Sequence, residues 1–381
     1  MPEGRTTPAR TERDVLDAIE DRRRRPVRRL ATDQVTLSHG AGGRASRDLI
    51  ESVFLGHLGN PALNPLDDSA VLGISPGTSR LAFSTDSFVV KPLFFPGGDI
   101  GSLSVAGTVN DLSVVGAEPL ALSSAFVLEE GLDSLTLEKV LRSMARTARV
   151  AGVPIVTGDT KVVERGAVQQ LIINTSGIGR RSPRMTGNLK QARRYRKLCS
   201  DWLLDSNIRP GDKIIVSGTV GDHGIAVLSF REGYSFEGDV RSDIRPLNGM
   251  MDAALKEGGV VSAKDPTRGG LANLLNEWAE KSKTGILVDE SSIPVNEPVR
   301  SACEMLGIDP LSIGNEGKAV LAVVPQKAEA VLAALRKTKE GRRAALIGEA
   351  TSEVKRVVLR TTIGGRRILE QPAGDPVPRI C

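Results

Sequence analysis

The sequence is poor in cysteine and aromatic residues and has no long apolar segment. Its 381 residues include three cysteines, none in a Cys-x-x-Cys pair, which argues against a disulfide scaffold and a structural zinc site. No apolar run approaches the roughly 20 residues of a membrane-spanning helix. The N-terminal segment shows no hydrophobic leader and contains acidic residues, unlike a transit peptide. We therefore expect a protein of the reducing cytoplasm without a membrane anchor.

A basic surface is also missing from most of the chain. The formal net charge is +5, but residues 1–33 hold nine Lys or Arg against seven Asp or Glu, and residues 180–206 hold eight against two. These segments carry +2 and +6, so the remainder carries −3. Nucleic-acid binding requires a basic face on the folded body, and we expect none here.

The length of the chain predicts more than one domain, because a single hydrophobic core rarely serves this many residues. We predict two domains, at residues 34–179 and 209–366. The remaining segments are interpreted from their composition: a basic disordered extension at 1–33, a basic linker or mobile loop at 180–208, and a flexible tail at 367–381.

The tail ends in a cysteine. Residues 371–378 contain three prolines, which exclude a helix or a central strand. Such a tether is extended and semi-rigid, so it could carry the Cys381 thiol about 30 Å. The alternative is a frayed chain end on which the cysteine has no role.

Isolated acidic residues accompany the apolar strands of the first domain. Asp68 precedes one predicted strand, whereas Asp86 and Asp159 follow the ends of two others. A predicted helix at 101–116 presents Thr108 and Asp111 on one polar stripe. Such carboxylates suit a site for Mg²⁺ and a triphosphate, since Mg²⁺ prefers oxygen ligands. Each Asp taken alone is more often a cap or a turn former.

In the second domain, Glu316 lies between glycines on a loop that leads into a predicted strand. A carboxylate in this position is suitable for general-base chemistry, although a surface turn is the alternative. Cys303 lies in an apolar helical stretch and is expected in the core. In the first domain, residues 134–150 give the clearest helical periodicity, with Gly152 as the C-terminal cap.

Nine short motifs together resemble one known family. They are His39-Gly40-Ala41-Gly42-Gly43, Ser84-Thr85-Asp86-Ser87, Phe94-Phe95-Pro96-Gly97-Gly98, Asn110-Asp111-Leu112, Gly158-Asp159-Thr160-Lys161, Gly221-Asp222-His223-Gly224, Asp265-Pro266-Thr267-Arg268-Gly269-Gly270, Gly314-Asn315-Glu316-Gly317-Lys318 and Pro378-Arg379-Ile380-Cys381. From about residue 34 to the end, the chain resembles the HypE carbamoyl dehydratases of [NiFe]-hydrogenase maturation. That family belongs to an ATP-binding superfamily with aminoimidazole ribonucleotide synthetase and selenophosphate synthetase.

The resemblance implies a two-domain α/β fold of the PurM-like, α+β type. The N-terminal ATP-binding domain would contain a mixed sheet, and the C-terminal domain would be an α/β sandwich. It also implies a cytoplasmic homodimer whose first domains meet in a shared sheet. The implied partners are a HypF-like carbamoyltransferase and a HypC–HypD-like complex, with no nucleic acid and no membrane.

The implied reaction takes place on the sulfur of Cys381. A carbamoyl group on this sulfur would be phosphorylated by ATP, and loss of phosphate would leave S-cyanocysteine, the source of the cyanide ligands of the hydrogenase iron. By motif, Glu316 would be the base and Lys161 a charge stabiliser or proton relay. The residues implied to bind the nucleotide are Asp68, Asp86, Thr108, Asn110, Asp111, Gly158, Asp159, Thr160 and Asp265. The Mg²⁺ ligands among them would be Asp68, Asp86, Asp111 and Asp159.

Two other functions remain open on the sequence alone. The chain could be a ligase of the same superfamily that activates an amide or formyl oxygen of a small molecule, in which case Cys381 would have no role. It could instead be an assembly scaffold that binds nucleotide only as a switch. Truncation of Cys381 would distinguish the dehydratase from the ligase, and loss of one water from a carbamoylated chain would distinguish it from the scaffold.

Overall fold

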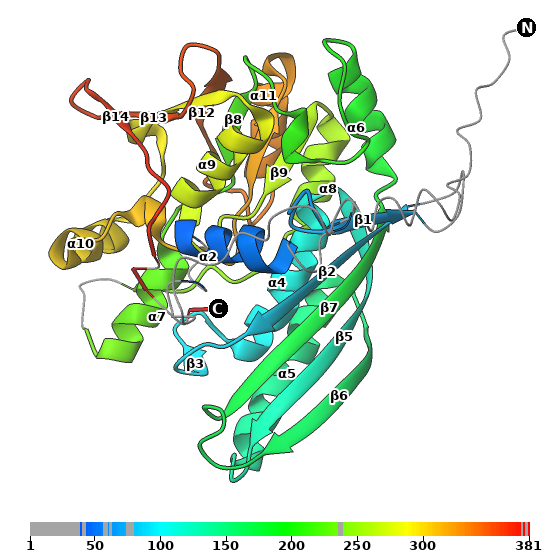
Figure 1. Cartoon of the computed structure of the whole chain (residues 1–381), viewed down its shortest axis with the longest axis vertical. Coiled ribbons are helices and arrows are strands. Elements are labelled where there is room, and N and C mark those ends of the chain that lie inside the picture. The colour runs from blue at the N-terminus through cyan, green and yellow to red at the C-terminus, as the bar shows by residue number, and fades with distance from the viewer. Residues whose placement is uncertain are drawn as a thin grey trace, which may run out of the picture.

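The chain folds into two halves, each built on its own β-sheet (Figure 1). The computed structural model describes residues 39, 43–55, 60, 63–73, 80–234, 239–374, 376–377 and 380–381. The predicted extension at 1–33, residues 40–42 of the motif that begins at His39, and Pro378 and Arg379 lie outside these residues. The two-domain α/β organisation expected from the sequence is confirmed.

The first half is a five-stranded sheet with the strand order β1-β2-β7-β5-β6. Its strands are β1 (Ala70–Gly73), β2 (Arg80–Phe88), β5 (Ala117–Glu129), β6 (Ile155–Val163) and β7 (Leu171–Arg181). All neighbours are antiparallel except β5 and β6, so the sheet is mixed. Along β7, alternate residues are buried, which is the period of a strand with one covered face.

Two helices cover that face, α4 (Ile100–Val114) and α5 (Ser134–Ala151). A capping box made by Asp99 and Ser102 begins α4, and Asp133 caps the N-terminus of α5. The predicted helix at 134–150 is confirmed, and Gly152 ends it in the left-handed region at φ 70°, where glycine carries no steric cost. A short hairpin, β3 (Phe94–Phe95) and β4 (Gly98–Asp99), leads into α4.

The second half is a seven-stranded sheet with helices on both faces. The strand order is β14-β13-β10-β12-β8-β11-β9. The strands are β8 (Lys213–Val216), β9 (Val260–Lys264), β10 (Gly285–Asp289), β11 (Val320–Val323), β12 (Ala345–Thr351), β13 (Val357–Arg360) and β14 (Arg366–Ile368). On β8, Ile215 packs with α8 (Asn248–Glu257) and α11 (Ala328–Arg336), whereas Ile214 and Val216 pack with α9 (Gly270–Ser282). A sheet covered on both faces explains why its central strands are apolar without alternation.

The basic segment 180–208 is folded and packs against both halves, so its interpretation as a mobile loop is wrong. It forms α6 (Arg184–Arg193) and the short helix η3 (Asp205–Asn207). Trp202 is buried, and the Asn207 side-chain amide donates to the backbone oxygens of Trp202 and Val261. The basic residues of α6 lie mostly on its outer side, while Met185 and Leu189 face the core. Counting charges did not reveal this amphipathic pattern.

The remaining helices lie between and around the two sheets. They are α2 (Arg44–Leu49), η2 (Ile50–Phe54), α7 (Asp222–Glu232), η4 (Glu290–Ser292), α10 (Glu297–Leu306), η5 (Pro310–Ser312) and η6 (Pro325–Lys327). Figure 1 shows α2 lying across the junction of the halves. Arg47 of α2 forms an ion pair with Glu280 of α9, so the second half fixes this helix. None of the described helices combines the length and apolarity required to cross a bilayer.

Described residues near the end of the C-terminal tail, which the sequence led us to expect as flexible, are packed inside the protein in this structure. Val377 and Ile380 are buried in the core cluster that also contains residues of α4, α7 and α10. Proline prevents regular structure in the tail but does not prevent its apolar side chains from packing. The described end of the chain therefore lies at the junction of the halves (Figure 1).

Candidate active site

Two carboxylates of the first half form the centre of the site. Asp86 lies within β2 rather than beyond its end, as the sequence had suggested, and it faces Asp111 on α4. Ser84 donates a hydrogen bond to Asp111 Oδ2 at 2.5 Å, and Thr108 donates to Asp86 Oδ2 at 3.4 Å. Burial, followed by the charge of Asp86, raises the pKa of Asp111 well above its usual range. Burial likewise raises the pKa of Asp86, so the pair favours holding a proton between them.

The second half contributes Asp265 and Glu316 to the same site. Asp265 follows β9 directly, and Glu316 lies on the loop before β11. Burial raises the pKa of both residues well above their usual range, and neighbouring carboxylates add to the effect. The sequence had placed Asp86, Asp111, Asp265 and Glu316 together by motif alone, and the structure brings them to one place. Their catalytic or binding roles stay predictions.

Arg268 is the cation that faces these carboxylates. It lies on the turn between β9 and α9, and its pKa is raised first by the negative charge at Cys381 and further by Asp86 and Glu316. The motif containing Arg268 was recognised in the sequence, but no role was predicted for it. An arginine on a tight Asp-x-x-Arg-Gly-Gly turn could have been proposed as the counter-ion.

The Glu316 loop is held by groups from both halves. Asp243 accepts a hydrogen bond from the Glu316 backbone N–H at 3.0 Å and pairs with Lys318 at 2.9 Å. A Cβ added at Gly317 would lie 1.8 Å from the Asp243 carbonyl oxygen, so the two loops touch where only glycine has room.

Asn110 also holds the Glu316 loop. Its amide donates to the carbonyl of Glu316 at 3.2 Å and to that of Arg245 at 3.1 Å, while its oxygen accepts from Leu247 N–H. Both N–H donors of Asn110 are therefore occupied by backbone carbonyls, and its role in nucleotide binding stays a prediction.

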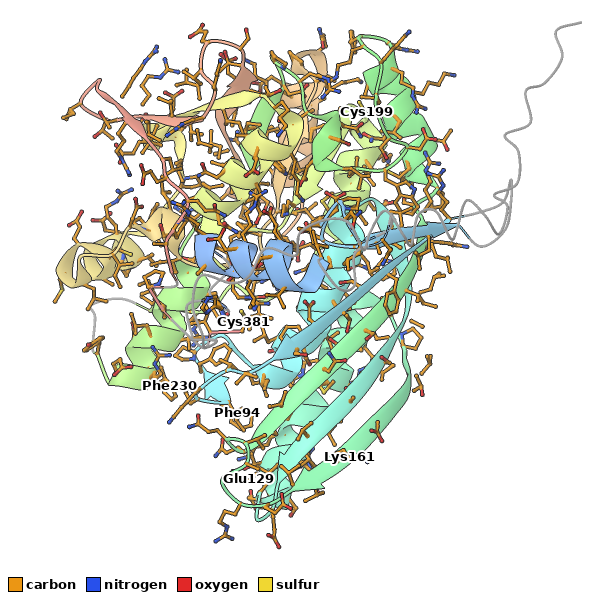
Figure 2. The ribbon with its side chains drawn as sticks, viewed as in Figure 1. Phe94, Glu129, Lys161, Cys199, Phe230 and Cys381 are labelled. Atoms are coloured by element: carbon orange, nitrogen blue, oxygen red, sulfur yellow. The ribbon has the colours of Figure 1, made fainter. Side chains whose placement is uncertain are left out.

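Cys381 lies beside these carboxylates. A small cavity of about 40 Å³ is lined by Asp86, Ser87, Phe88, Gly107, Asp111, Asp265, Thr267, Arg268, Glu316 and Cys381. Figure 2 shows Cys381 at the junction of the halves. The sequence could not give the position of the thiol, and the structure places it inside the site.

A larger cavity adjoins the small one. It measures about 630 Å³ and lies between α2, β2 and α9, within the range of nucleotide and cofactor sites. Five residues line both cavities: Asp86, Asp111, Asp265, Thr267 and Arg268. A molecule in the large cavity would therefore meet the thiol across the carboxylates.

Two lysines in the large cavity were missed by the sequence analysis. Lys264 pairs with Asp68 at 3.1 Å and with Glu277 at 2.6 Å, and Lys281 pairs with Asp205 at 3.0 Å. Burial raises the pKa of Asp68 to about 6, although Lys264 opposes the shift. Lys264 ends a fully buried strand, and a charged residue there is a signal that could have been used.

The motif at 158–161 lies away from this site in the folded subunit. Pairing registers align Asp86 with Thr175, Thr175 with Ser124, and Ser124 with Gly158, so three strand spacings, about 14 Å, separate Asp86 from Gly158. Asp159 therefore cannot bind a metal ion together with Asp86 of the same chain, and that predicted ligand set is wrong within one subunit. The tight fit of Gly158 against the Ser124 carbonyl, 2.2 Å from a built Cβ, is structural.

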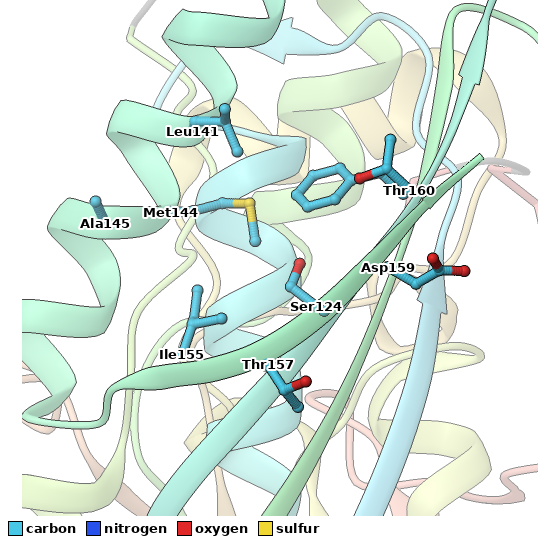
Figure 3. Close-up of a pocket in the computed structure, with 10 residues that line it drawn as sticks. Ser124, Leu141, Met144, Ala145, Ile155, Thr157, Asp159 and Thr160 are labelled. Atoms are coloured by element: carbon cyan, nitrogen blue, oxygen red, sulfur yellow. The ribbon is translucent and has the colours of Figure 1, made fainter. Parts of the chain in front are cut away.

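Residues of this motif line a third cavity of about 530 Å³ between α5 and β6. Figure 3 shows Leu141 and Met144 on its helical side, with Asp159 projecting away from the helix. Figure 2 places Lys161 on the outer strand, well apart from Cys381.

No group of three or more His, Cys, Asp or Glu side chains in the described part of the chain is arranged to hold a metal ion alone. The donors present nevertheless fit Mg²⁺, which usually takes one or two carboxylates and completes its shell with phosphate and water oxygens. Asp86 and Asp111 fit this description, because the two carboxylates face each other and both line the large and the small cavity, as Asp265 also does.

The fold and the family models define a protein of the AIR synthase related class. The model of the AIR synthase related N-terminal domain matches residues 66–181, and that of the C-terminal domain matches residues 209–360. Carbamoyl dehydratase HypE of Azotobacter vinelandii is 45% identical, covering 92% of this chain and 98% of that protein. HypE of Escherichia coli K12 is 44% identical, covering 92% and 100%. The chain belongs to the HypE family of carbamoyl dehydratases.

Solved structures of the family agree. A HypE–HypF complex matches with a TM-score of 0.76 and 43% identity over 85% of this chain and 99% of that chain. HypE in complex with ATP matches with a TM-score of 0.72 and 46% identity over 91% and 100%.

Proposed function

We propose that this protein is an ATP-dependent carbamoyl dehydratase that makes the cyanide ligands of a hydrogenase active site. Its substrate would be the thiocarbamate on its own Cys381. The observation that carries the proposal is the shared wall of the two cavities: a nucleotide in the larger one would have its phosphates beside the Cys381 sulfur. A relative of this chain was crystallised with ATP.

In the proposed reaction, the carbamoyl oxygen attacks the γ-phosphorus of ATP and ADP leaves. The C–O bond then breaks with departure of phosphate, and two protons leave the nitrogen in all, which gives the S–C≡N group. An oxygen that leaves as phosphate is a far better leaving group than oxide or hydroxide.

Glu316 is the proposed base for the nitrogen protons. It lines the small cavity with Cys381, and burial raises its pKa well above the usual range, which makes its carboxylate a stronger base than that of an exposed glutamate. Arg268 would stabilise negative charge on the transferring phosphate. Burial of the tail would keep water from hydrolysing the activated carbamoyl group.

Asp86 and Asp111 are the proposed ligands of Mg²⁺, with Asp68 and Asp265 assisting in nucleotide binding. The ion would supply charge neutralisation on the phosphates. Thr108 would orient Asp86 through its hydrogen bond.

In a homodimer, Asp159, Thr160 and Lys161 of one subunit would lie at the nucleotide site of the other. Every residue from 155 to 162 on β6 is exposed, including the apolar Val156 and Val162. An exposed apolar edge strand is a ready surface for pairing. In a shared sheet, this motif of the partner subunit would complete the nucleotide site.

The partners are proposed from chemistry and from the relatives. A HypF-like carbamoyltransferase would load Cys381, as a HypE–HypF complex exists for a relative. A HypC–HypD-like complex would accept the cyanide. Both steps require the tail to leave the cavity, in the cytoplasm where its partners act.

Intact-mass spectrometry tests the proposal. The purified protein, carbamoylated at Cys381, is incubated with ATP and Mg²⁺, and we expect loss of one water from the chain. Removing Cys381 should abolish loading and cyanation while ATP binding persists. Glu316→Gln should stop at the carbamoyl stage. A carbamoylated chain that keeps its mass while ATP binds would instead favour a nucleotide-switched scaffold, and cyanation-independent turnover of a small amide would favour a ligase.

A further inference from the structure

The carbonyl of Ile380, the residue before the terminal cysteine, is bound by a buried histidine. His223 Nε2 on α7 lies 2.7 Å from the Ile380 oxygen. A carbonyl oxygen only accepts, so Nε2 carries the hydrogen and Nδ1 is the acceptor of a neutral ring. Nδ1 lies 2.8 Å from Ser242 Oγ, which therefore donates to it.

A chain of hydrogen bonds fixes the ring in this tautomer. The Ile244 backbone N–H donates to Ser242 Oγ at 3.3 Å, the Ser242 hydroxyl donates to His223, and His223 donates to the tail. His223 is fully buried, and burial lowers its pKa even though Asp243 opposes the shift. The edge-to-face ring of Phe95, with centroids 5.6 Å apart, also restrains it. The imidazole is thus an oriented neutral donor aimed at the tail.

The side chain of Ile380 occupies a socket formed by two glycines. A Cβ built on Gly314 would lie 2.9 Å from Ile380 Cδ1, and one on Gly224 would lie 3.5 Å from it. Ile380 is 1% exposed. The folded body therefore contacts both the backbone carbonyl and the side chain of Ile380. The next residue is Cys381, which lines the small cavity.

We propose that His223 is a positioning residue that, with the glycine socket, latches the penultimate residue and so holds Cys381 opposite Glu316 and Arg268. The latch has to open for the thiol to meet a protein that loads or unloads it. The catalytic consequence rests on the proposed function, whereas the latch itself is a property of the unloaded chain.

Two substitutions of His223 separate this role from simple packing. The amide nitrogen of Gln reaches the position of Nε2 and can donate to the Ile380 carbonyl. The amide of Asn reaches only as far as Nδ1, so it leaves the carbonyl without its donor. His223→Gln should therefore retain the latch, and His223→Asn should lose it.

Alkylation by iodoacetamide of the unloaded, full-length protein measures the latch, with each cysteine followed by peptide mapping. The exposed Cys199 is an internal reference, and the buried Cys303, whose pKa is raised to about 11, reports unfolding. Loss of a buried hydrogen bond should accelerate alkylation of Cys381 about five- to tenfold in His223→Asn. The rates at Cys199 and Cys303 should stay at the wild-type value, and His223→Gln should return Cys381 to within about twofold of it.

Ile380→Ala provides a variant that changes no residue outside the tail. It empties the socket and should also accelerate alkylation of Cys381. If His223→Asn also accelerates alkylation of Cys303, the substitution has loosened the core. The rate at Cys381 in Ile380→Ala is then the test of the latch. Wild-type Cys381 reactivity in Ile380→Ala, or in a folded His223→Asn protein, overturns the latch.

Cyanation kinetics then separate the test of the latch from the test of the proposed dehydratase function. In His223→Asn we expect slower cyanation with ATP affinity unchanged, and recovery in His223→Gln. A wild-type protein that never loses water from its carbamoyl form would refute the proposed function. The alkylation result would still establish or refute the latch.

Discussion

Five buried carboxylates crowd the junction of the two halves, and the pKa of each is raised. Burial is the largest cause of the raised pKa of Asp68, Asp86, Asp111, Asp265 and Glu316, and for Asp111, Asp265 and Glu316 neighbouring carboxylates are the next largest. Without a bound cation this arrangement destabilises the fold, because like charges are held together out of water. The site therefore trades stability for affinity toward a cationic, phosphate-bearing ligand.

Asp265→Asn should stabilise the unliganded protein while weakening its affinity for Mg²⁺-ATP. The substitution removes one of the crowded charges, and we expect a melting temperature higher by about 2 °C or more. Affinity should fall about tenfold, the effect of losing one charged contact. Scanning calorimetry and titration calorimetry measure the two effects. Asp252→Asn, on an exposed salt bridge to Arg184, is the control and should change neither.

The same variant gives a pH dependence with a defined sign. The pKa of Asp265 is raised in the fold, so its carboxyl binds a proton more tightly folded than unfolded. Wild-type stability is then lost as pH rises above about 4, the pKa of an unfolded aspartate, toward the raised value. The Asn variant lacks this loss, so its advantage should grow from pH 4 to neutral pH. An advantage that shrinks with rising pH would contradict the charge argument.

Sequence motifs identified the residues proposed to react better than they identified the residues that hold the site together. Asp86, Asp111, Asp265, Glu316 and Cys381 meet in space as the motifs suggested. Lys264 and Asp205 were missed, because an ion pair between segments far apart in the chain leaves no local pattern. Asn110 was assigned to the nucleotide for its place in a motif, although its hydrogen bonds join two segments of backbone.

At the scale of elements, β6 is the segment whose exposure the rest of the fold does not explain. If it pairs with a second subunit as proposed, Val156→Lys should convert the dimer to a monomer, since a charge on an edge strand opposes pairing. Sedimentation velocity gives the mass. Val150→Lys on the exposed end of α5 is the matched control and should leave the dimer intact. A dimeric Val156→Lys protein would exclude β6 as the interface.

The Glu316 loop depends on a glycine. Gly317→Ala would force the Asp243 and Glu316 loops apart, because the added Cβ would lie 1.8 Å from a backbone oxygen. We expect cyanation to slow by about a hundredfold, as displacing a catalytic group by about 1 Å commonly does. Gly249→Ala on α8, where a Cβ meets nothing within 4 Å, should leave the rate unchanged. Intact-mass kinetics of the carbamoylated variants measure both, and a Gly317→Ala protein as fast as wild type would mean that the loop position is unimportant.

The type of an element was predictable where one hydrophobic periodicity ran through the whole segment, as in α5. The ends of the strands were not predictable. Asp86 and Asp159 were expected beyond their strands, whereas β2 and β6 continue through both. Pairing with β7 and β5 extends these strands through polar residues, and such pairing is decided by tertiary partners.

At the scale of the whole molecule, the active site exists only where the two halves meet. The core cluster at this junction takes residues from α4 of the first half, from α7 and α10 of the second, and from the tail. Hydrogen bonds from Asn110 cross the same junction. Relative placement of the halves therefore sets the distance between the thiol, the carboxylates and Glu316.

Asn110→Ala tests whether that placement controls the chemistry. Removing the amide leaves buried backbone groups of Arg245, Leu247 and Glu316 without partners, at a cost of about 1–3 kcal/mol in the free energy of unfolding. Because the large cavity does not include Asn110, ATP affinity should stay within about twofold of wild type. Cyanation should slow at least tenfold, since Glu316 loses its anchor to α4.

A matched variant separates positioning from general loosening. Asn248→Ala removes another hydrogen bond between the halves, from Asn248 to the Ala151 carbonyl at 2.8 Å, far from Glu316 in the chain and not in either cavity of the site. It should lower the melting temperature much as Asn110→Ala does but leave the cyanation rate near wild type. Differential scanning calorimetry and intact-mass kinetics on both variants give the comparison. If both slow cyanation equally, the junction acts only through overall stability, and Asn110 has no special hold on the catalytic loop.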